Sequence, residues 1–252
     1  MVQAREDETD PELTDPTHAC TLPARVPGIQ VRLHGGGRFG YAGPMLTRTP
    51  DATRTEHIFA ADPPEQDAVV LLSDVPWAVY EALLKSRRDA PVPRYAYVNG
   101  DLEIMSPGRA HERTKTNLGR LIEAFGMLRN VPVTGMGSWT LKSRLLKKGV
   151  EPDECYFVGR SEGEAPDLAI EVVMASDALD KLPIYAALGV REVWIWRNGA
   201  LTVHGLQGEA YTPVGRSTLL PDLDLTMLTM LAPQTDQHAA LQTWMRWLRA
   251  GA

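Results

Sequence analysis

One short run constrains the fold more than any other: residues 168–173, which read LAIEVV and carry a carboxylate, Glu171, among aliphatic and β-branched residues. A strand that is apolar on both faces usually lies inside a sheet that is covered on both sides. A charged carboxylate there is costly unless a cation or several hydrogen bonds hold it. We therefore expect a positive group beside Glu171.

Two Pro-Asp pairs, at residues 152–153 and 166–167, each begin a short run of strand-forming residues, with a glycine-containing turn between the runs. Strand alternation places Asp167 and Glu171 on one face, and a hairpin would bring Asp153 beside that face. Oxygen ligands that converge in this way suit a hard divalent ion such as Mg²⁺ or Mn²⁺, which completes its shell with water and substrate phosphate. The pattern favours a metal site.

The order of these elements resembles the Uma-type family of the PD-(D/E)XK phosphodiesterase superfamily, whose fold is shared by many restriction endonucleases. The similar segments cover roughly residues 69–231 and are YVNGDLEIMSPGRAHER, GSWTLK, EPDECYFVG, PDLAIEVV, DKLPIYAALGVREVWIW and LLPDLDL. The resemblance implies a mixed α/β fold with a restriction-endonuclease-like core, in which helices flank a central mixed sheet. It also implies a Mg²⁺-dependent or Mn²⁺-dependent endonuclease that hydrolyses phosphodiester bonds in DNA.

The resemblance extends to single residues. Asp153 matches the family's metal-binding aspartate, and Glu171 matches the acidic member of the (D/E)XK element. Asp167 is expected to be a third ligand or to support the ligands from behind. Additional candidates, for a further acid or for a contact to phosphate or metal-bound water, are Glu103, His111 and Glu112.

The lysine of the (D/E)XK element would fall at Val173, which departs from the superfamily pattern. In the Uma-type branch a lysine beyond the strand is thought to substitute, and Lys181 is the residue that matches. Proline is tolerated mainly in the first turn of a helix, so Pro183 predicts a helix that begins near Leu182. Lys181 would then lie just before this helix.

Each of these residues also has an ordinary structural interpretation. An aspartate that follows proline at a strand start often makes a turn hydrogen bond, which applies to Asp153 and Asp167. Glu171 could form a buried ion pair, and Lys181 alone would usually be a surface lysine. For His111 a hydrogen bond at the start of a helix is equally plausible, and Glu103 and Glu112 could be surface charges.

Charge is unevenly distributed along the chain. Residues 1–68 carry 11 acidic and 6 basic residues, so they account for −5 of the formal net charge of −6. The segment 109–148 has nine Lys or Arg residues against two acids, a pattern that phosphate backbones attract. It can equally be a solvated helix face and a lysine-rich loop. The candidate nucleic-acid contacts are Arg109, Arg113, Lys115 and Lys142.

Residues 1–68 are rich in Pro, Thr and Asp and have no sustained periodicity, so we expect a disordered leader before a domain at 69–252. The chain offers neither a signal-peptide pattern nor a run of about 18 apolar residues, which favours a soluble, cytoplasmic protein. Cys20 and Cys155 lie in unlike contexts and predict neither a disulfide nor a zinc site.

Local patterns predict several elements. A helix is expected over 73–89, with Ser73 or Asp74 at its N-cap, and two Asn-Gly pairs, at 99–100 and 198–199, predict hairpins. A last strand is expected through 223–225. The terminal helix carries an apolar stripe that includes Trp244, which would close the core or contact a second copy in a homodimer.

Two other functions are open at this point. The first is a DNA-binding module on the same fold. It would bind DNA without hydrolysing it, because Val173 replaces the lysine. A protein-interaction module would use the leader or the stripe around Trp244. The sequence does not specify the DNA sequence preference, the oligomeric state or the biological role.

Overall fold

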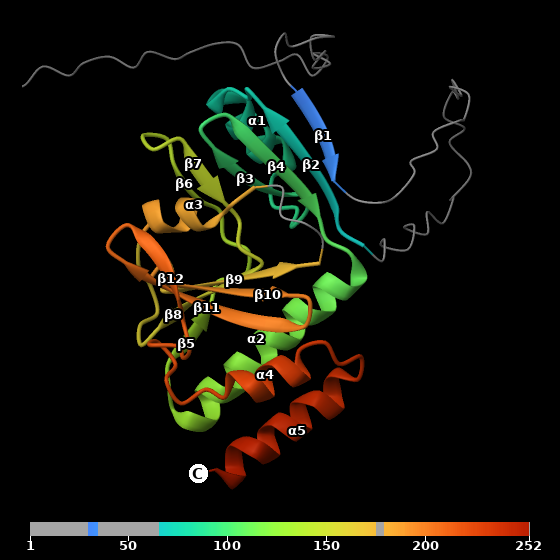
Figure 1. The fold of residues 1–252 in the computed structure, drawn as a ribbon, viewed down its shortest axis with the longest axis vertical. Coiled ribbons are helices and arrows are strands. Elements are labelled where there is room, and N and C mark those ends of the chain that lie inside the picture. Colours follow the sequence, from blue (N-terminus) through green and yellow to red (C-terminus); the bar gives the residue numbers. More distant parts are fainter. Residues whose placement is uncertain (1–29, 35–65, 175–178, 252) are drawn as a thin grey trace, which may run out of the picture.

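The computed structural model describes residues 30–34, 66–174 and 179–251, of which the first segment is described by its backbone alone. Within these ranges the chain forms a mixed α/β fold with two six-stranded sheets and five helices (Figure 1). The mixed α/β class is therefore confirmed, with two sheets where the sequence predicted one central sheet. The candidate site lies where the two sheets meet.

The first sheet is antiparallel, and its outer helix is α1 (Trp77–Arg87). Apolar residues of α1 pack on this sheet around Tyr80, which is fully buried and stacks on Tyr97. In spatial order the strands are β1 (Gln30–His34), β2 (Ala68–Ser73), β4 (Asp101–Ser106), β3 (Arg94–Val98), β7 (Lys148–Val150) and β6 (Leu141–Ser143).

The second sheet is mixed because its two central strands, β9 and β10, are parallel while all other neighbours are antiparallel. In spatial order its strands are β12 (Ala210–Val214), β11 (Ala200–Gln207), β10 (Glu192–Arg197), β9 (Leu168–Val173), β8 (Glu154–Val158) and β5 (Val133–Gly135). The run with Glu171 is thus a central strand, as its two apolar faces predicted.

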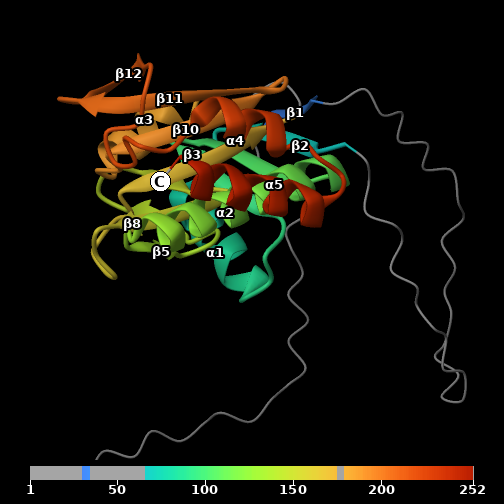
Figure 2. The ribbon, with the colours of Figure 1, turned by 90° about the horizontal axis from the view of Figure 1, so that it is seen from below.

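Three helices cover one face of the second sheet: α2 (Arg109–Arg129), α4 (Leu225–Leu231) and α5 (Gln237–Ala250) (Figure 2). Side chains from this face, Trp194 and Trp196 among them, pack with Phe125 and Trp244 in the main core. The other face packs against α3 (Leu182–Ala187) and residues of the first sheet. Trp244 is fully buried, which confirms the core interpretation of the terminal stripe.

Both Asn-Gly hairpins are confirmed, since Val98 pairs with Asp101 and Arg197 pairs with Ala200 across the two turns. The predicted cap of α1 is wrong, because β2 continues through Ser73 and the helix begins after Pro76.

The predicted strand at 223–225 is also wrong. The side chain of Asp224 accepts hydrogen bonds from the backbone N–H groups of Thr226, at 2.9 Å, and Met227, at 3.0 Å. This N-cap satisfies free donors of the first turn, so the segment begins α4 instead.

The first strand lies within the predicted leader. β1 pairs with β2 in antiparallel register and extends the first sheet, and β2 itself begins at residue 68. The rest of the predicted leader up to residue 65 lies outside the described residues, as does Cys20. Cys155 is a buried free thiol. In the described part of the chain, no helix combines the length and apolar character that a membrane crossing requires.

Candidate active site

Two buried carboxylates face each other across neighbouring strands. Glu154 pairs with Ile170 in antiparallel register, and the backbone N–H of Asp153 donates to the carbonyl of Ile170 at 3.1 Å. The register therefore places Asp153 opposite Glu171 at the end of the β8–β9 hairpin. Asp153 is only 1% exposed and Glu171 only 4%. Two like charges in so little solvent require compensation.

Glu171 receives this compensation from a cation and a phenol. Lys181 Nζ lies 3.0 Å from Oε2 of Glu171, and the hydroxyl of Tyr185 donates to Oε1. The positive group expected beside Glu171 is thus present. Burial and then the charge of Asp153 raise the pKa of Glu171, and the contacts to Lys181 and Tyr185 offset this only in part. The glutamate is therefore a stronger base than an ordinary carboxylate.

Lys181 lies between carboxylates from both sheets. The residue immediately precedes α3, as Pro183 predicted, and its Nζ is 3.1 Å from Oε1 of Glu103 on β4. Burial lowers the pKa of this amine, but the charges of Glu171 and Glu103 outweigh that effect and raise it. The side chain consequently remains an ammonium at neutral pH and acts as a donor.

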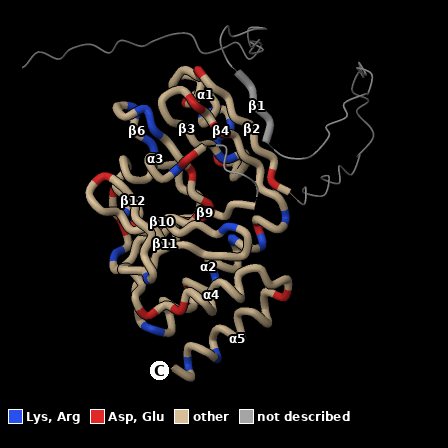
Figure 3. Tube along the Cα trace, viewed as in Figure 1, with Lys and Arg blue, Asp and Glu red and all other residues tan. Residues whose placement is uncertain are grey.

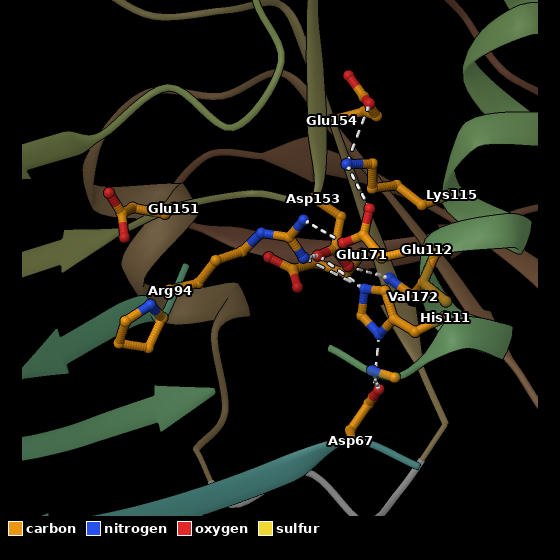
Figure 4. A network of polar contacts seen from close by, with 12 residues as sticks. Asp67, Arg94, His111, Glu112, Lys115, Glu151, Asp153, Glu154, Glu171 and Val172 are labelled. Carbon is orange, nitrogen blue, oxygen red and sulfur yellow. Dashed lines mark hydrogen bonds and ion pairs between the residues drawn. The ribbon is translucent and has the colours of Figure 1, made fainter. Parts of the chain in front are cut away.

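Asp153 is enclosed by a second set of donors (Figure 4). Arg94 donates to Oδ1, His111 Nε2 lies 2.9 Å from the same oxygen, and the backbone N–H of Val172 donates to Oδ2 at 2.7 Å. Burial raises the pKa of Asp153, but the charges of His111 and Arg94 outweigh it and hold the pKa well below its usual range. Asp153 is therefore ionised under all ordinary conditions.

His111 links this carboxylate to another one. Its Nδ1 lies 2.9 Å from Asp67 Oδ2, while Asp67 Oδ1 accepts the backbone N–H of Gly108 at 2.8 Å. Burial lowers the pKa of His111, but the two flanking aspartates raise it to about 9. The imidazolium therefore bridges the segment before β2 and the start of β8.

Arg94, Asp67 and Tyr185 are site residues that sequence reasoning missed. Arg94 is buried, and besides Asp153 it contacts Glu112, with its second terminal nitrogen 2.8 Å from Oε1. An arginine at a strand start and an aspartate inside a predicted leader carry no local signal of this role. Their partners lie 59 and 44 positions away along the chain.

Comparisons with known proteins place the chain in a family. Residues 77–242 match the sequence model of Uma2, a family described as "Putative restriction endonuclease". The chain belongs to the Uma2 family. A search of solved structures found a crystal structure of "a putative nuclease belonging to DUF820 from Anabaena variabilis ATCC 29413", with 13% identity and a TM-score of 0.39, covering 62% of this chain and 92% of that chain. The curated proteins gave no significant match.

Asp167 is the one predicted ligand of this Uma2 protein that lies apart from the others. It precedes β9, four positions before Glu171, and its carboxylate is held by Arg160 at 2.9 Å and 3.0 Å and by the N–H of Val158 at 3.0 Å. Burial raises its pKa, but the hydrogen bonds from Arg160 and Val158 lower it overall. These contacts organise the β8–β9 turn.

The predicted nucleic-acid contacts occupy two places. Arg109, Arg113 and Lys115 lie on α2 beside the site, and Lys115 Nζ is 3.0 Å from Glu112 Oε2. Lys142 lies on β6 in the first sheet, where its side chain is 43% exposed and its Nζ is 3.7 Å from Glu81. Figure 3 shows basic residues on both sheets and along α2.

The donor set fits a hard divalent cation. Asp153 and Glu171 offer carboxylate oxygens, each of which can accept more than one contact, and Mg²⁺ needs only one or two carboxylates when water and phosphate complete its shell. Among the residues that the structure describes, no group of three His, Cys, Asp or Glu side chains forms a ready-made cage for a metal ion.

Proposed function

We propose that this Uma2 protein is a metal-dependent endonuclease that hydrolyses phosphodiester bonds in DNA. The observation that carries the proposal is the pair Asp153 and Glu171. Two buried carboxylates oppose each other across β8 and β9, the charge of one raises the pKa of the other, and an ammonium lies 3.0 Å from the second. In such an arrangement Asp153 and Glu171 would hold a divalent cation, and Lys181 would contact a phosphate that approaches them.

Asp153 and Glu171 would hold Mg²⁺ or Mn²⁺. When bound, the ion would lower the pKa of a water molecule and neutralise charge on the scissile phosphate. Asp153 is suited to this because its pKa is low, so it offers a permanent negative charge. Glu171, whose pKa is raised, gains most from a nearby positive charge.

Lys181 would stabilise charge that develops on the phosphate oxygens. Its ammonium is oriented by two carboxylates, from Glu171 and Glu103, and has a further N–H with which to donate. Because its raised pKa keeps it protonated, it does not act as the base. This geometry supports the substitution of Lys181 for the lysine that Val173 lacks.

His111 and Arg94 would position Asp153 and not react themselves. Both contact the same carboxylate oxygen, and Asp67 holds His111 from its other side. The basic residues of α2, with Lys115 nearest to Glu112 and Glu154, would attract the phosphate backbone. Arg109, Arg113 and Lys142 are proposed to extend this contact.

The proposal is tested by nicking of supercoiled plasmid with Mg²⁺ or Mn²⁺ and with a chelator. Wild type should nick only with the metal, and Glu171→Gln should lower the rate by roughly three orders of magnitude, since a metal's charge stabilisation contributes several kcal/mol. Asp153→Asn should do the same. Lys181→Met should lower the rate without abolishing metal binding.

The matched control is Glu192→Gln, a buried glutamate on the adjacent strand β10 that faces away from the site. It should retain nicking below its unfolding temperature. Equal rates for wild type and Glu171→Gln would refute the assignment.

One observation favours a second candidate, the DNA-binding module without catalysis. Arg94 and His111 already neutralise Asp153 at Oδ1, so two protein cations occupy part of the space in which a metal would act. In that case, purified protein would bind DNA in a salt-dependent manner, would show no Mn²⁺ binding by calorimetry and would not nick plasmid.

A further inference from the structure

A cavity of about 440 Å³ adjoins Glu171 and Lys181 on the side away from Asp153's donors. Its floor is one face of the second sheet. Glu171 pairs with Ile195, and Ile195 pairs with Thr202, so these three side chains form a row across β9, β10 and β11 on that face. The cavity therefore begins at the candidate catalytic glutamate and continues across two further strands.

The neighbouring rows complete the floor. On one side lie Val173, Arg197 and Ala200, which are paired in the same order across the three strands, and on the other Val193 is paired with His204. Val173, Val193, Ile195 and Ala200 form the apolar part of this surface. Polar side chains lie at both ends, with Glu171 on β9, Arg197 on β10 and, on β11, the hydroxyl of Thr202 at 3.2 Å from Nε2 of His204.

The wall of the cavity is the start of α3. Leu182 and Tyr185 line it, with Lys181 immediately before them. This helix has only six residues and lies between the second sheet and the first (Figure 1), so it covers only part of the sheet face. Ile195 is half-buried and Thr202 is exposed. A partly apolar floor therefore meets an ammonium at one end and hydrogen-bonding groups at the other.

We infer that this cavity receives one unpaired nucleobase of a DNA strand, next to the phosphate held at Glu171 and Lys181. The inference rests on the proposed function and specifies its substrate: DNA in which the nucleotide beside the cut is unpaired or displaced from the stack. In this inference Thr202 and His204 recognise the substrate and take no part in the hydrolysis.

The shape and chemistry of the cavity suit a base. Its volume lies within the range that encloses a small organic ligand, and the apolar side chains of its floor can contact the face of a ring. The hydroxyl of Thr202 donates to the carbonyl of Ile195 at 3.3 Å, so toward a base it accepts, while the imidazole of His204 has one nitrogen that donates and one that accepts. Burial lowers the pKa of His204, so its ring is neutral at pH 7 and offers both functions.

The inference places a single base in the cavity, between α3 on one side and the β10–β11 hairpin on the other. Enzymes that place a base in a pocket act on single strands or turn the nucleotide out of the duplex, which is easiest where the base is already unpaired. Preference for unpaired DNA is therefore the expected property.

The test compares two substitutions at one exposed position. Thr202→Phe places a ring over the cavity floor, whereas Thr202→Val keeps the volume of threonine and removes only the hydroxyl. Binding is measured in a chelator, so that cleavage is not needed, with a labelled duplex and with the same duplex containing a short unpaired bubble. A 2-aminopurine in the bubble reports whether its base leaves the stack.

Wild type should bind the bubble roughly tenfold or more tightly than the duplex, with a rise in 2-aminopurine fluorescence. Thr202→Phe should abolish both the preference and the fluorescence change, with duplex affinity unaltered, and Thr202→Val, which removes only the hydroxyl, should reduce the preference without abolishing it. Equal affinity of wild type for both DNAs, preference that survives Thr202→Phe, or no DNA binding would overturn the inference.

The result is separable from the test of hydrolysis. Plasmid nicking by a protein that binds duplex and bubble equally would overturn the base pocket and leave the nuclease intact. A preference for the bubble that Thr202→Phe removes, in a protein that nicks nothing, would support the pocket and refute hydrolysis.

Discussion

Two buried glutamates occupy adjacent strands of the same sheet and have opposite properties. Glu171 on β9 contacts an ammonium and a phenol, and its pKa is raised. Glu192 on β10 is 1% exposed, and its pKa is lowered, because donors including Thr218, Trp194 and Ser217 outweigh the effect of burial. The difference shows that buried carboxylates on adjacent strands can have their pKa values shifted in opposite directions by the donors and charges around them.

The donors explain the contrast. Glu192 accepts hydrogen bonds from Ser217, from the backbone and hydroxyl of Thr218, from the N–H of Leu219 and from the indole of Trp194, all between 2.6 Å and 3.1 Å. These neutral groups satisfy the charge completely and fix the segment after β12. Glu171 has fewer donors and a like charge nearby, and it borders an open cavity.

The largest expected effect on stability comes from Glu192→Ala. This change leaves the buried donors of Ser217, Thr218 and Leu219 without their acceptor, so we expect a loss of about 3 kcal/mol in the free energy of unfolding. Urea denaturation followed by circular dichroism measures it. Glu171→Gln is the comparison and should cost less, because Lys181 keeps Glu103 as a partner and the repulsion from Asp153 is removed. A larger loss for Glu171→Gln than for Glu192→Ala would contradict the contrast.

The pH dependence of stability should separate the two glutamates by sign. The pKa of Glu192 is lowered by folding, so its contribution is present above the pKa of the unfolded chain and is lost as the pH falls through the folded pKa. The pKa of Glu171 is raised, so its ionisation costs stability once the pH rises above the unfolded pKa.

Thermal unfolding of wild type, Glu192→Gln and Glu171→Gln from neutral to acidic pH measures this difference. Relative to wild type, Glu192→Gln should lose less stability on acidification. Any advantage of Glu171→Gln at neutral pH should shrink as the pH falls. Parallel curves for all three proteins would show that the two carboxylates do not differ.

The smallest effect is expected from Trp194→Phe. The substitution removes one donor to Glu192, whose indole contact is 3.0 Å, and keeps most of the aromatic packing in the core. The cost should be about 1 kcal/mol for the hydrogen bond, with some additional loss of volume. In the Glu192→Gln background the same change should cost less, which a double-mutant cycle by urea denaturation would detect.

Local pattern was sufficient to predict Glu171 and its cation but not the distinction between the two glutamates. Glu192 stands in an equally apolar run, VREVWIW, yet nothing in that run indicates the donors at 217–219, more than twenty positions away. The hairpins and the start of α3 were predictable because Asn-Gly and Pro183 act through neighbouring residues.

The parts that sequence reasoning missed are those that depend on contacts between the sheets. Arg94 and Asp67 join the site only because β3 and the segment before β2 meet the end of the β8–β9 hairpin. The cavity depends on how much of a sheet face the six-residue α3 covers. Neither the contacts between the sheets nor the extent of the sheet face that α3 covers is encoded in a local periodicity or a single motif.

The pairing of β1 with β2 has a consequence for the handling of the protein. Gln30–His34 is the outermost strand of the first sheet and shields the backbone of β2 from neighbours. A shortened chain that starts at residue 66 would present Ala68–Ser73, with its sequence AVVLLS, as an uncovered sheet edge. Exposed apolar edges of this kind promote pairing with strands of other molecules, so β1 protects the protein against aggregation.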